Sequence, residues 1–294
     1  MRLESALTIL DKPKHDQTAF DRAVALQAET GMHLDLASFC WQPMVAQSEF
    51  FDAHQRRTLK QEILLERKKW QRALVLDAGI AAADVTLHTA WTEDIAGWVS
   101  RSLEKKPRDL VIKSVHHTKS MTHTPLDWEL LRTCPVPVLL TTTRKRKAAK
   151  RVLAALDLRS TDRKHTRLNR KVLAAANQMA QLQGAELHCV SALEISNVLR
   201  DLDIIDERET KKRMLERSKG VLDDLLAPYD VKKSHRHFPV GKVGQVVGHT
   251  ARKLNASLLV VGSFSHRVRQ LVGLGNSAEK ILARATCDVL AVHP

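Results

Sequence analysis

The chain contains two copies of one pattern, and this internal repeat constrains its fold more than any other feature. A short segment near the end of the first half, Asp109–Ser114, matches Leu258–Ser263 near the end of the chain. Each is preceded by an amphipathic helix-like segment. Each is followed by a loop, another helix-like segment and a last aliphatic run, Pro135–Thr142 or Cys287–Pro294. A repeat of this size over 294 residues predicts two similar domains.

The beginnings of the two halves match as well. The apolar runs Ala6–Asp11 and Val152–Asp157 both end in aspartate, and the helix-like segments after them stop at Gly31 and Gly184. Strands that alternate with helices predict right-handed crossovers and a parallel sheet. Aromatic residues make up only 4% of the chain, so the cores are aliphatic, as a sheet covered on both faces requires. We therefore expect an α/β fold of two tandem Rossmann-like domains, each a five-stranded parallel sheet with helices on both faces.

The remaining elements set the expected domain limits. Second and third strands are predicted at Met32–Phe39, Asp84–Thr89, Ala185–Leu193 and Val231–Phe238, and long helices at Gln55–Asp77 and Glu207–Leu226. We expect a first domain over residues 1–143, a linker over residues 144–151 and a second domain over residues 152–294. The linker is strongly basic, and we interpret it as a solvated connection, with a nucleic-acid-binding segment as the alternative.

The net charge is +14, from 47 basic and 33 acidic residues. Such a charge attracts phosphates, anionic lipids or nucleic acid. It is spread widely here, however, and no basic stretch is interleaved with stacking aromatic residues. We favour a solubilising role and expect no nucleic-acid partner. No signal-peptide core or membrane-spanning run is visible, so the expected compartment is the cytoplasm.

Cysteine and histidine give weak signals. The four cysteines stand near predicted strands with no CxxC pair, which predicts buried, reduced thiols. His116, His117 and His123 gather in one loop of the first half and are weak candidates for a transition-metal site. His235 and His237 fall in a predicted strand, and we interpret them as surface or hydrogen-bonded side chains.

The end of the fourth strand in the second half is suited to an anion. In an open parallel sheet, ligands bind beyond the carboxyl ends of the strands. Here the strand ends at Gly262, Ser263 and Ser265 follow, and the loop closes at Gly275–Ser277 before a helix-like segment. Glycine lets the backbone approach a ligand, and a helix N-terminus offers free N–H groups. A helix-capping loop rich in glycine and serine would have the same appearance without a ligand.

These residues resemble the phosphate loop of the universal stress protein family. The spacing Gly262-x-x-Ser265, nine residues and Gly275-Asn276-Ser277 is similar to that motif, with Ser265 in place of a second glycine and Asn276 where a hydroxyl residue is usual. The string from Gly275 to Glu279 and the segment Thr124–Leu131 resemble the tandem, E-type members. The resemblance covers essentially the whole chain. It implies two domains of the adenine nucleotide alpha hydrolase type that pair as an internal pseudo-dimer.

The resemblance also implies a ligand, ATP or ADP with Mg²⁺, in the second domain. The phosphates would contact Gly262, Ser263, Ser265, Gly275, Asn276 and Ser277. The base would lie against Asp157 and Val190, and Gly241 would line the same cleft. For Asp157, a simple turn or helix cap is an equal alternative. In the first half, Lys113–His116 stands where Gly262–Ser265 stands in the second, which implies a structural first domain or one that binds another ligand.

These observations predict a stress-response protein that binds a small ligand and signals through its conformation or its partners. No general base stands beside the phosphate loop, so we predict no catalytic residue and at most a weak ATPase activity. Two alternatives stay open: a fold that has lost nucleotide binding and holds a lipid-like or other small molecule, and a basic protein associated with nucleic acid. A homodimer of whole chains is compatible with the sequence, since symmetric oligomers are common.

Overall fold

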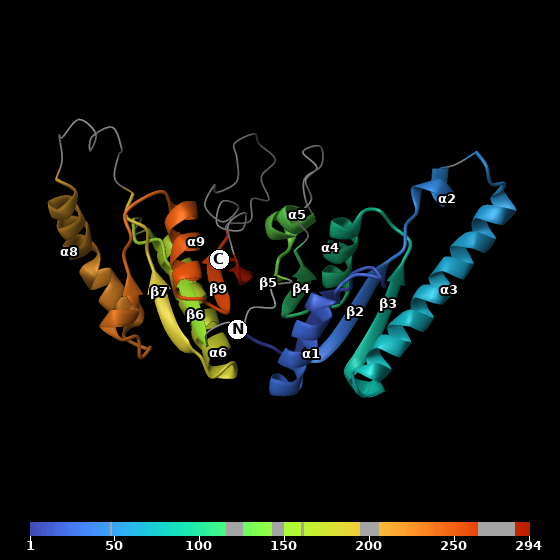
Figure 1. The fold of residues 1–294 in the computed structure, drawn as a ribbon, viewed down its shortest axis with the longest axis horizontal. Coiled ribbons are helices and arrows are strands. Elements are labelled where there is room, and N and C mark those ends of the chain that lie inside the picture. Colours follow the sequence, from blue (N-terminus) through green and yellow to red (C-terminus); the bar gives the residue numbers. More distant parts are fainter. Residues whose placement is uncertain (48, 116–125, 143–149, 160–161, 195–205, 264–285) are drawn as a thin grey trace. The chain divides into compact units, whose positions relative to one another are not determined.

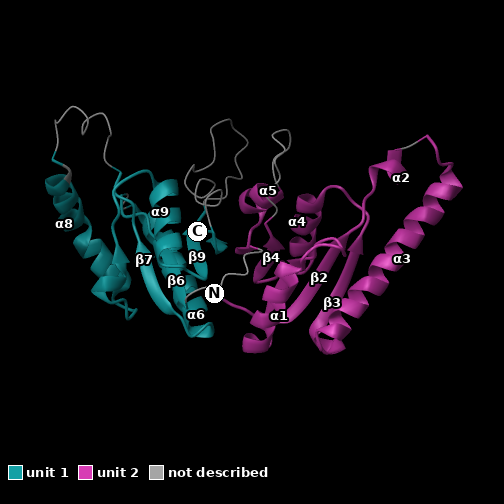
Figure 2. Cartoon of the chain, in the orientation of Figure 1, with its two compact units in different colours: residues 1, 144–294 teal, residues 2–143 magenta. Residues whose placement is uncertain are grey.

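The computed structural model divides the chain into two compact units, residues 2–143 and residues 144–294, and Met1 falls with the second (Figure 2). The structure describes all residues except 48, 116–125, 143–149, 160–161, 195–205 and 264–285. Within the described part, no helix is long and apolar enough to cross a membrane.

The first unit is a parallel sheet flanked by helices (Figure 1). Its strands are β1 (Ser5–Ile9), β2 (His33–Phe39), β3 (Val85–Ala90), β4 (Leu110–Ser114) and β5 (Val138–Thr141). They lie in the order β3-β2-β1-β4-β5. The helices are α1 (Thr18–Thr30), α2 (Pro43–Gln47), α3 (Ala53–Asp77), α4 (Ile95–Lys105) and α5 (Leu126–Thr133), with a 3₁₀ turn η1 (Ala82–Asp84).

The second unit repeats this topology. Its strands are β6 (Arg151–Ala155), β7 (Glu186–Val190), β8 (Arg236–His237), β9 (Leu258–Gly262) and β10 (Asp288–Val292). They lie in the order β8-β7-β6-β9-β10, again all parallel. Its described helices are α6 (Arg163–Leu182), α8 (Glu207–Leu226) and α9 (Val243–Lys253), with a 3₁₀ turn η2 (Lys233–His235). The predicted α/β class with a five-stranded parallel sheet in each half is confirmed.

Local sequence explains most of these elements. Each first helix ends before a glycine in the left-handed region, Gly31 at φ 70° and Gly184 at φ 54°, as the sequence predicts. Most strands are aliphatic and buried, and β4 is buried along its whole length, whereas the edge strands β3 and β8 are only half-buried. The four cysteines are buried thiols outside any disulfide, as expected, and burial raises the pKa of the Cys134 and Cys189 thiols to about 11.

Two sequence interpretations are wrong in detail. The strand predicted at Val231–Phe238 shrinks to the two residues of β8, because its polar run lacks the alternation that a half-buried strand needs. The match between Lys113 and Gly262 is displaced by one residue. Ser114 pairs with Thr141 on the neighbouring strand as Gly262 pairs with Val292, so Ser114 occupies the position of Gly262. Aliphatic strands carry few side chains that mark their register, so the sequence alone did not reveal this one-residue offset between the two halves.

Candidate functional site

The carboxyl edge of the first sheet is closed by its own side chains. The Ser114 hydroxyl, at the end of β4, donates a hydrogen bond to Asp11. It also accepts hydrogen bonds from the Thr18 hydroxyl at 2.8 Å and from the Ala19 N–H at 3.0 Å. An N–H group at the start of α1, which would otherwise be free to bind an anion, is thus satisfied internally.

Lys113 completes this closure. Its ammonium group lies 2.6 Å from an Asp127 carboxylate oxygen of α5, and it donates to the Ser114 carbonyl at 2.7 Å. The two side chains are only 8% and 10% exposed. A buried charge pair of this kind is held by mutual neutralisation, and removing one partner leaves the other uncompensated. Lys113, the last residue but one of β4, is therefore fixed in the interior.

The corresponding edge of the second sheet is built differently. Gly262 ends β9 without a side chain, and an added Cβ would lie 2.6 Å from the Leu168 side chain of α6. The next residue, Ser263, is buried, and its N–H donates to the Val292 carbonyl at 2.8 Å. His293 Nδ1 donates to the Ser263 carbonyl at 3.1 Å. Gly262 is thus required for close helix packing, which is a structural reason for the glycine independent of any ligand.

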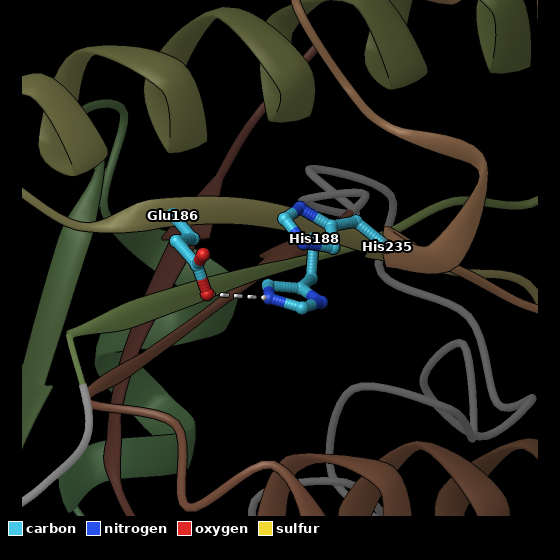
Figure 3. A group of neighbouring side chains, drawn as sticks. All are labelled: Glu186, His188 and His235. Carbon is cyan, nitrogen blue, oxygen red and sulfur yellow. Dashed lines mark ion pairs between the residues drawn. The ribbon is translucent and has the colours of Figure 1, made fainter.

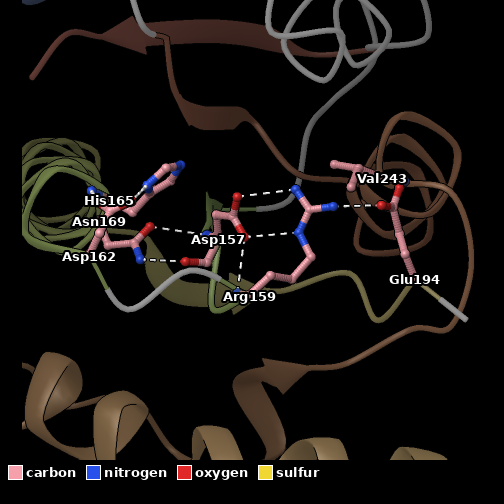
Figure 4. A network of polar contacts seen from close by, with 7 residues as sticks. All are labelled: Asp157, Arg159, Asp162, His165, Asn169, Glu194 and Val243. Carbon is pink, nitrogen blue, oxygen red and sulfur yellow. Dashed lines mark hydrogen bonds and ion pairs between the residues drawn. The ribbon is translucent and has the colours of Figure 1, made fainter.

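Asp157 lies just beyond β6 at this edge. Its backbone is fixed by Asn169 of α6, whose amide group exchanges hydrogen bonds with the Asp157 N–H at 3.0 Å and carbonyl at 2.8 Å (Figure 4). Its carboxylate accepts from the Arg159 N–H at 3.1 Å and from the guanidinium at 3.0 and 3.1 Å. Burial alone would raise the pKa of Asp157, but the hydrogen bonds from Arg159 lower it overall. The side chain keeps 35% of its surface exposed.

Arg159 connects this aspartate to a second element. Its guanidinium also lies 2.5 Å from a Glu194 carboxylate oxygen. The other Glu194 oxygen accepts the Val243 N–H, in the first turn of α9, at 3.1 Å (Figure 4). The series Asp157, Arg159, Glu194 and Val243, here called the Arg159 bridge, runs from the end of β6 to the N-terminus of α9.

Five of the predicted site residues lie at this edge, because Asp157, Val190 and Gly241 join Gly262 and Ser263 there. The Val190 carbonyl, at the end of β7, accepts the N–H of Leu156 at 2.8 Å, which places Val190 beside Asp157. Gly241 has φ 138° and donates to the Leu193 carbonyl at 3.0 Å, next to the Arg159 bridge. The other predicted positions, Ser265, Gly275, Asn276 and Ser277, lie outside the described residues, as do His116, His117 and His123.

Sequence interpretation missed the partners of these residues. Arg159 follows Asp157 by two positions, the spacing of a side-chain turn, and this signal could have been used. Glu194 contacts Arg159 only because the fold brings the two residues together, so no local sequence pattern predicts this ion pair. His293 was visible as a histidine in an aliphatic last strand. It is buried, its Nε2 has no hydrogen-bond partner among the described residues, and burial lowers its pKa.

Comparison with known proteins places this two-unit α/β chain in a family. A sequence profile described as Universal stress protein family matches residues 148–293. Universal stress protein A homolog 1 of Coxiella burnetii is 31% identical over 145 residues, which cover 49% of this chain and 95% of that protein. The chain belongs to the universal stress protein family.

Its similarity to one tandem member extends over both halves. Universal stress protein E of Salmonella typhi is 24% identical over 300 residues, covering 99% of this chain and 94% of that protein. Among solved structures, a functionally unknown protein from Pseudomonas aeruginosa PAO1 has a TM-score of 0.70 at 23% identity, covering 99% of this chain and 93% of that one. At this identity the structural likeness establishes the fold alone.

Proposed function

We propose that this stress-response protein binds ATP or ADP, with Mg²⁺, at the carboxyl edge of the second unit's sheet. The observation that carries the proposal is the difference between the two edges. In the first unit, Ser114 and Lys113 are tied to acidic partners at the end of β4. In the second unit, the corresponding strand β9 ends in Gly262, which has no side chain, and the Asp157 carboxylate stays partly exposed.

The residues at this edge fit the parts of an adenine nucleotide. An ionised Asp157 is an acceptor for the amino group of the base, and Val190 offers an apolar neighbour. By the motif resemblance, the phosphates would contact Gly262 and Ser263, and the guanidinium of Arg159 supplies positive charge. The motif resemblance adds Ser265, Gly275, Asn276 and Ser277 as phosphate contacts. Mg²⁺ in such a site is expected to be held mainly by the phosphates and water.

The Arg159 bridge connects the proposed base-binding carboxylate of Asp157 with the N-terminus of α9, and ligand binding could be transmitted along it. A base that uses the Asp157 carboxylate competes with Arg159 for the same oxygens. Arg159 has a partly exposed side chain and can turn away from Asp157. Such a turn loosens its contact with Glu194, the residue that accepts the N–H at the start of α9. Ligand binding would in this way be transmitted to the position of α9.

Calorimetric titration of MgATP and MgADP into the full chain tests the proposal. We expect binding that Asp157→Ala weakens by at least about tenfold, because a hydrogen bond to a charged group is lost. Asp11→Ala, the matched change at the closed edge, should leave the affinity unchanged. Absence of binding in the unchanged protein would reject the nucleotide and favour the lipid-like ligand. Equal loss in both variants would reject the assignment to the second unit.

Two further expectations from the sequence belong to this proposal. The cytoplasm is the compartment in which we expect the protein to act, and the pairing of the two units as an internal pseudo-dimer remains a prediction.

A further inference from the structure

A cluster of imidazole and carboxylate groups lies between β7 and β8 of the second unit, away from the Arg159 bridge. Glu186 and His188 alternate along β7, and His235 comes from η2. One ligand atom from each lies within 4.8 Å of the others (Figure 3). His237 of β8 adds a third imidazole, with its Nε2 3.1 Å from His188 Nδ1. The sequence interpretation took His235 and His237 as surface or hydrogen-bonded side chains of one strand and did not connect them with His188.

His188 is the centre of the cluster. It is 4% exposed, and its Nε2 is buried with no hydrogen-bond partner among the described residues. That nitrogen lies 3.6 Å from a Glu186 carboxylate oxygen, beyond hydrogen-bond range. If Nδ1 donates its proton to His237, the Nε2 lone pair faces a carboxylate. Two electron-rich atoms in this arrangement repel each other unless a cation lies between them.

Glu186 supplies the negative charge of the cluster, and its carboxylate oxygen lies 3.4 Å from the Nε of Arg151 at the start of β6.

The first unit has an internal cation at the matched place. Asp35 of β2 pairs with Leu7 of β1 in the first unit, and His188 of β7 pairs with Leu153 of β6 in the second. Asp35 and His188 therefore occupy the same position of the repeat. Asp35 is bound by the Arg108 guanidinium at 2.6 and 2.7 Å.

The second unit has no arginine at the position of Arg108. The same backbone hydrogen bond occurs in both units: the Asp109 N–H donates to the Ser5 carbonyl in the first, and the Ser257 N–H donates to the Arg151 carbonyl in the second. The residue before each donor therefore has the same position, which is Arg108 in the first unit and the buried Ala256 in the second. An alanine supplies no charge, whereas histidine replaces aspartate at the centre.

We propose that Glu186, His188 and His235 bind one transition-metal ion of the Zn²⁺ class, with His237 positioning the His188 ring. Two imidazoles and a carboxylate form a common donor set for zinc, and copper and nickel also accept imidazole. Ligand atoms in a tetrahedral zinc site lie about 3.3 Å apart. The separation of 3.6 Å between Glu186 and His188 is close to that value.

One side chain has to move for binding. The His235 ring is stacked on His188, with centroids 4.0 Å apart and planes at 22°, so their in-plane lone pairs do not converge. His235 is partly exposed on a short turn and can rotate toward the Glu186 carboxylate. Glu186 is exposed, which leaves the fourth coordination position open to water. His237, which touches His188 through Nδ1, would fix the ring in the manner of an outer hydrogen-bond partner.

Titration of Zn²⁺ into the full metal-free chain, followed by calorimetry and by competition with a chromophoric chelator, tests this site. We expect one ion per chain in the tight phase. His235→Ala should weaken binding by more than about a hundredfold, and His237→Ala by about 10–100-fold. His188→Ala is the strongest change but removes a buried ring, so His235→Ala and Glu186→Gln carry the test, with circular dichroism as the check on folding.

Two controls make the result decisive. His249→Ala changes another histidine of the second unit and should leave zinc affinity unchanged. The triple variant His116→Ala, His117→Ala, His123→Ala removes the cluster that the sequence suggested. It should also retain full affinity. Absence of tight zinc binding in the unchanged chain, or loss in the triple variant with retention in His235→Ala, would overturn the proposal.

Discussion

The buried ion pair between Asp35 and Arg108 should be the most sensitive electrostatic contact of the first unit. The Asp35 side chain is 0% exposed and that of Arg108 is 2% exposed, and His88 Nε2 adds a contact to Asp35 at 2.7 Å. Burial alone would raise the pKa of Asp35. The hydrogen bonds from Arg108 and His88 instead hold it well below its usual range. Arg108 is the closest buried cation to this carboxylate, and the exposed Lys106 ammonium lies farther away at 3.8 Å.

Arg108→Met keeps most of the side-chain volume and removes the guanidinium. Leaving one buried charge without its partner costs about 3–5 kcal/mol. A unit of this size loses about 2–4 °C in melting temperature for each kcal/mol, so its midpoint should fall by about 6–20 °C. Arg101→Met breaks an exposed pair with Asp94 and is the matched control, with little expected change. Arg108→Met combined with Asp35→Leu should recover much of the loss.

Tryptophan fluorescence can report this unit selectively. All five tryptophans of the chain lie in its first half. Trp98 contacts the rings of Phe39 and His88, with centroids 5.2 and 5.7 Å away, and so senses the surroundings of Asp35 directly. Urea and thermal unfolding of the full chain should both show the loss. A destabilisation by Arg108→Met no larger than that by Arg101→Met would show that the buried ion pair does not stabilise the first unit.

The pH dependence of unfolding stability provides an independent test of the contribution of Asp35. In the unchanged protein the folded-state pKa of Asp35 lies below its unfolded value. The stabilisation is therefore complete above that unfolded pKa and is lost as the pH falls through the folded one. In Arg108→Met, burial without the guanidinium should raise the pKa of Asp35, so the variant's deficit shrinks as acid protonates the group. A deficit that stays constant from neutral pH to pH 4 would contradict this explanation.

Two smaller predictions concern the carboxyl edges. Lys113→Met should destabilise the first unit, because it leaves the Asp127 carboxylate buried without its partner, and Asp127→Leu in the same chain should restore stability. Tryptophan-detected unfolding measures both effects. An unchanged unfolding midpoint in Lys113→Met would contradict the closed edge. Gly262→Ala should lower the melting temperature seen by circular dichroism, because the new Cβ meets Leu168 at 2.6 Å, whereas Leu168→Ala in addition should relieve the contact. Equal melting of the parent and Gly262→Ala would show that the helix yields freely.

The repeated fold could be predicted because its signals are local. Aliphatic runs, helix-like periodicity and glycine stops recur in both halves, and α8 (Glu207–Leu226) was predicted to the residue. The β8 region failed because its polar side chains carry no strand pattern. The register slip at Ser114 arose because similar letters in two aliphatic strands do not fix which residues pair.

The site was less accessible to the sequence because its contacts join distant residues. Asp157, Val190 and Gly241 could be named from the motif resemblance. Glu194 reaches Arg159 only through the fold. His188 and His237, which lie 49 residues apart, meet only when β7 and β8 pair. Their cluster was invisible to a search for short spacings, because two of its members come from a turn and a two-residue strand.

We propose that the two copies of one fold are unequal, with a closed first edge and a ligand-binding second edge. Native mass spectrometry of the full chain with MgATP distinguishes the two edges, because it counts ligands per chain. We expect one nucleotide per chain. Two nucleotides would contradict the closed edge at Ser114 and Lys113, and none would contradict the assignment of a nucleotide to the second unit.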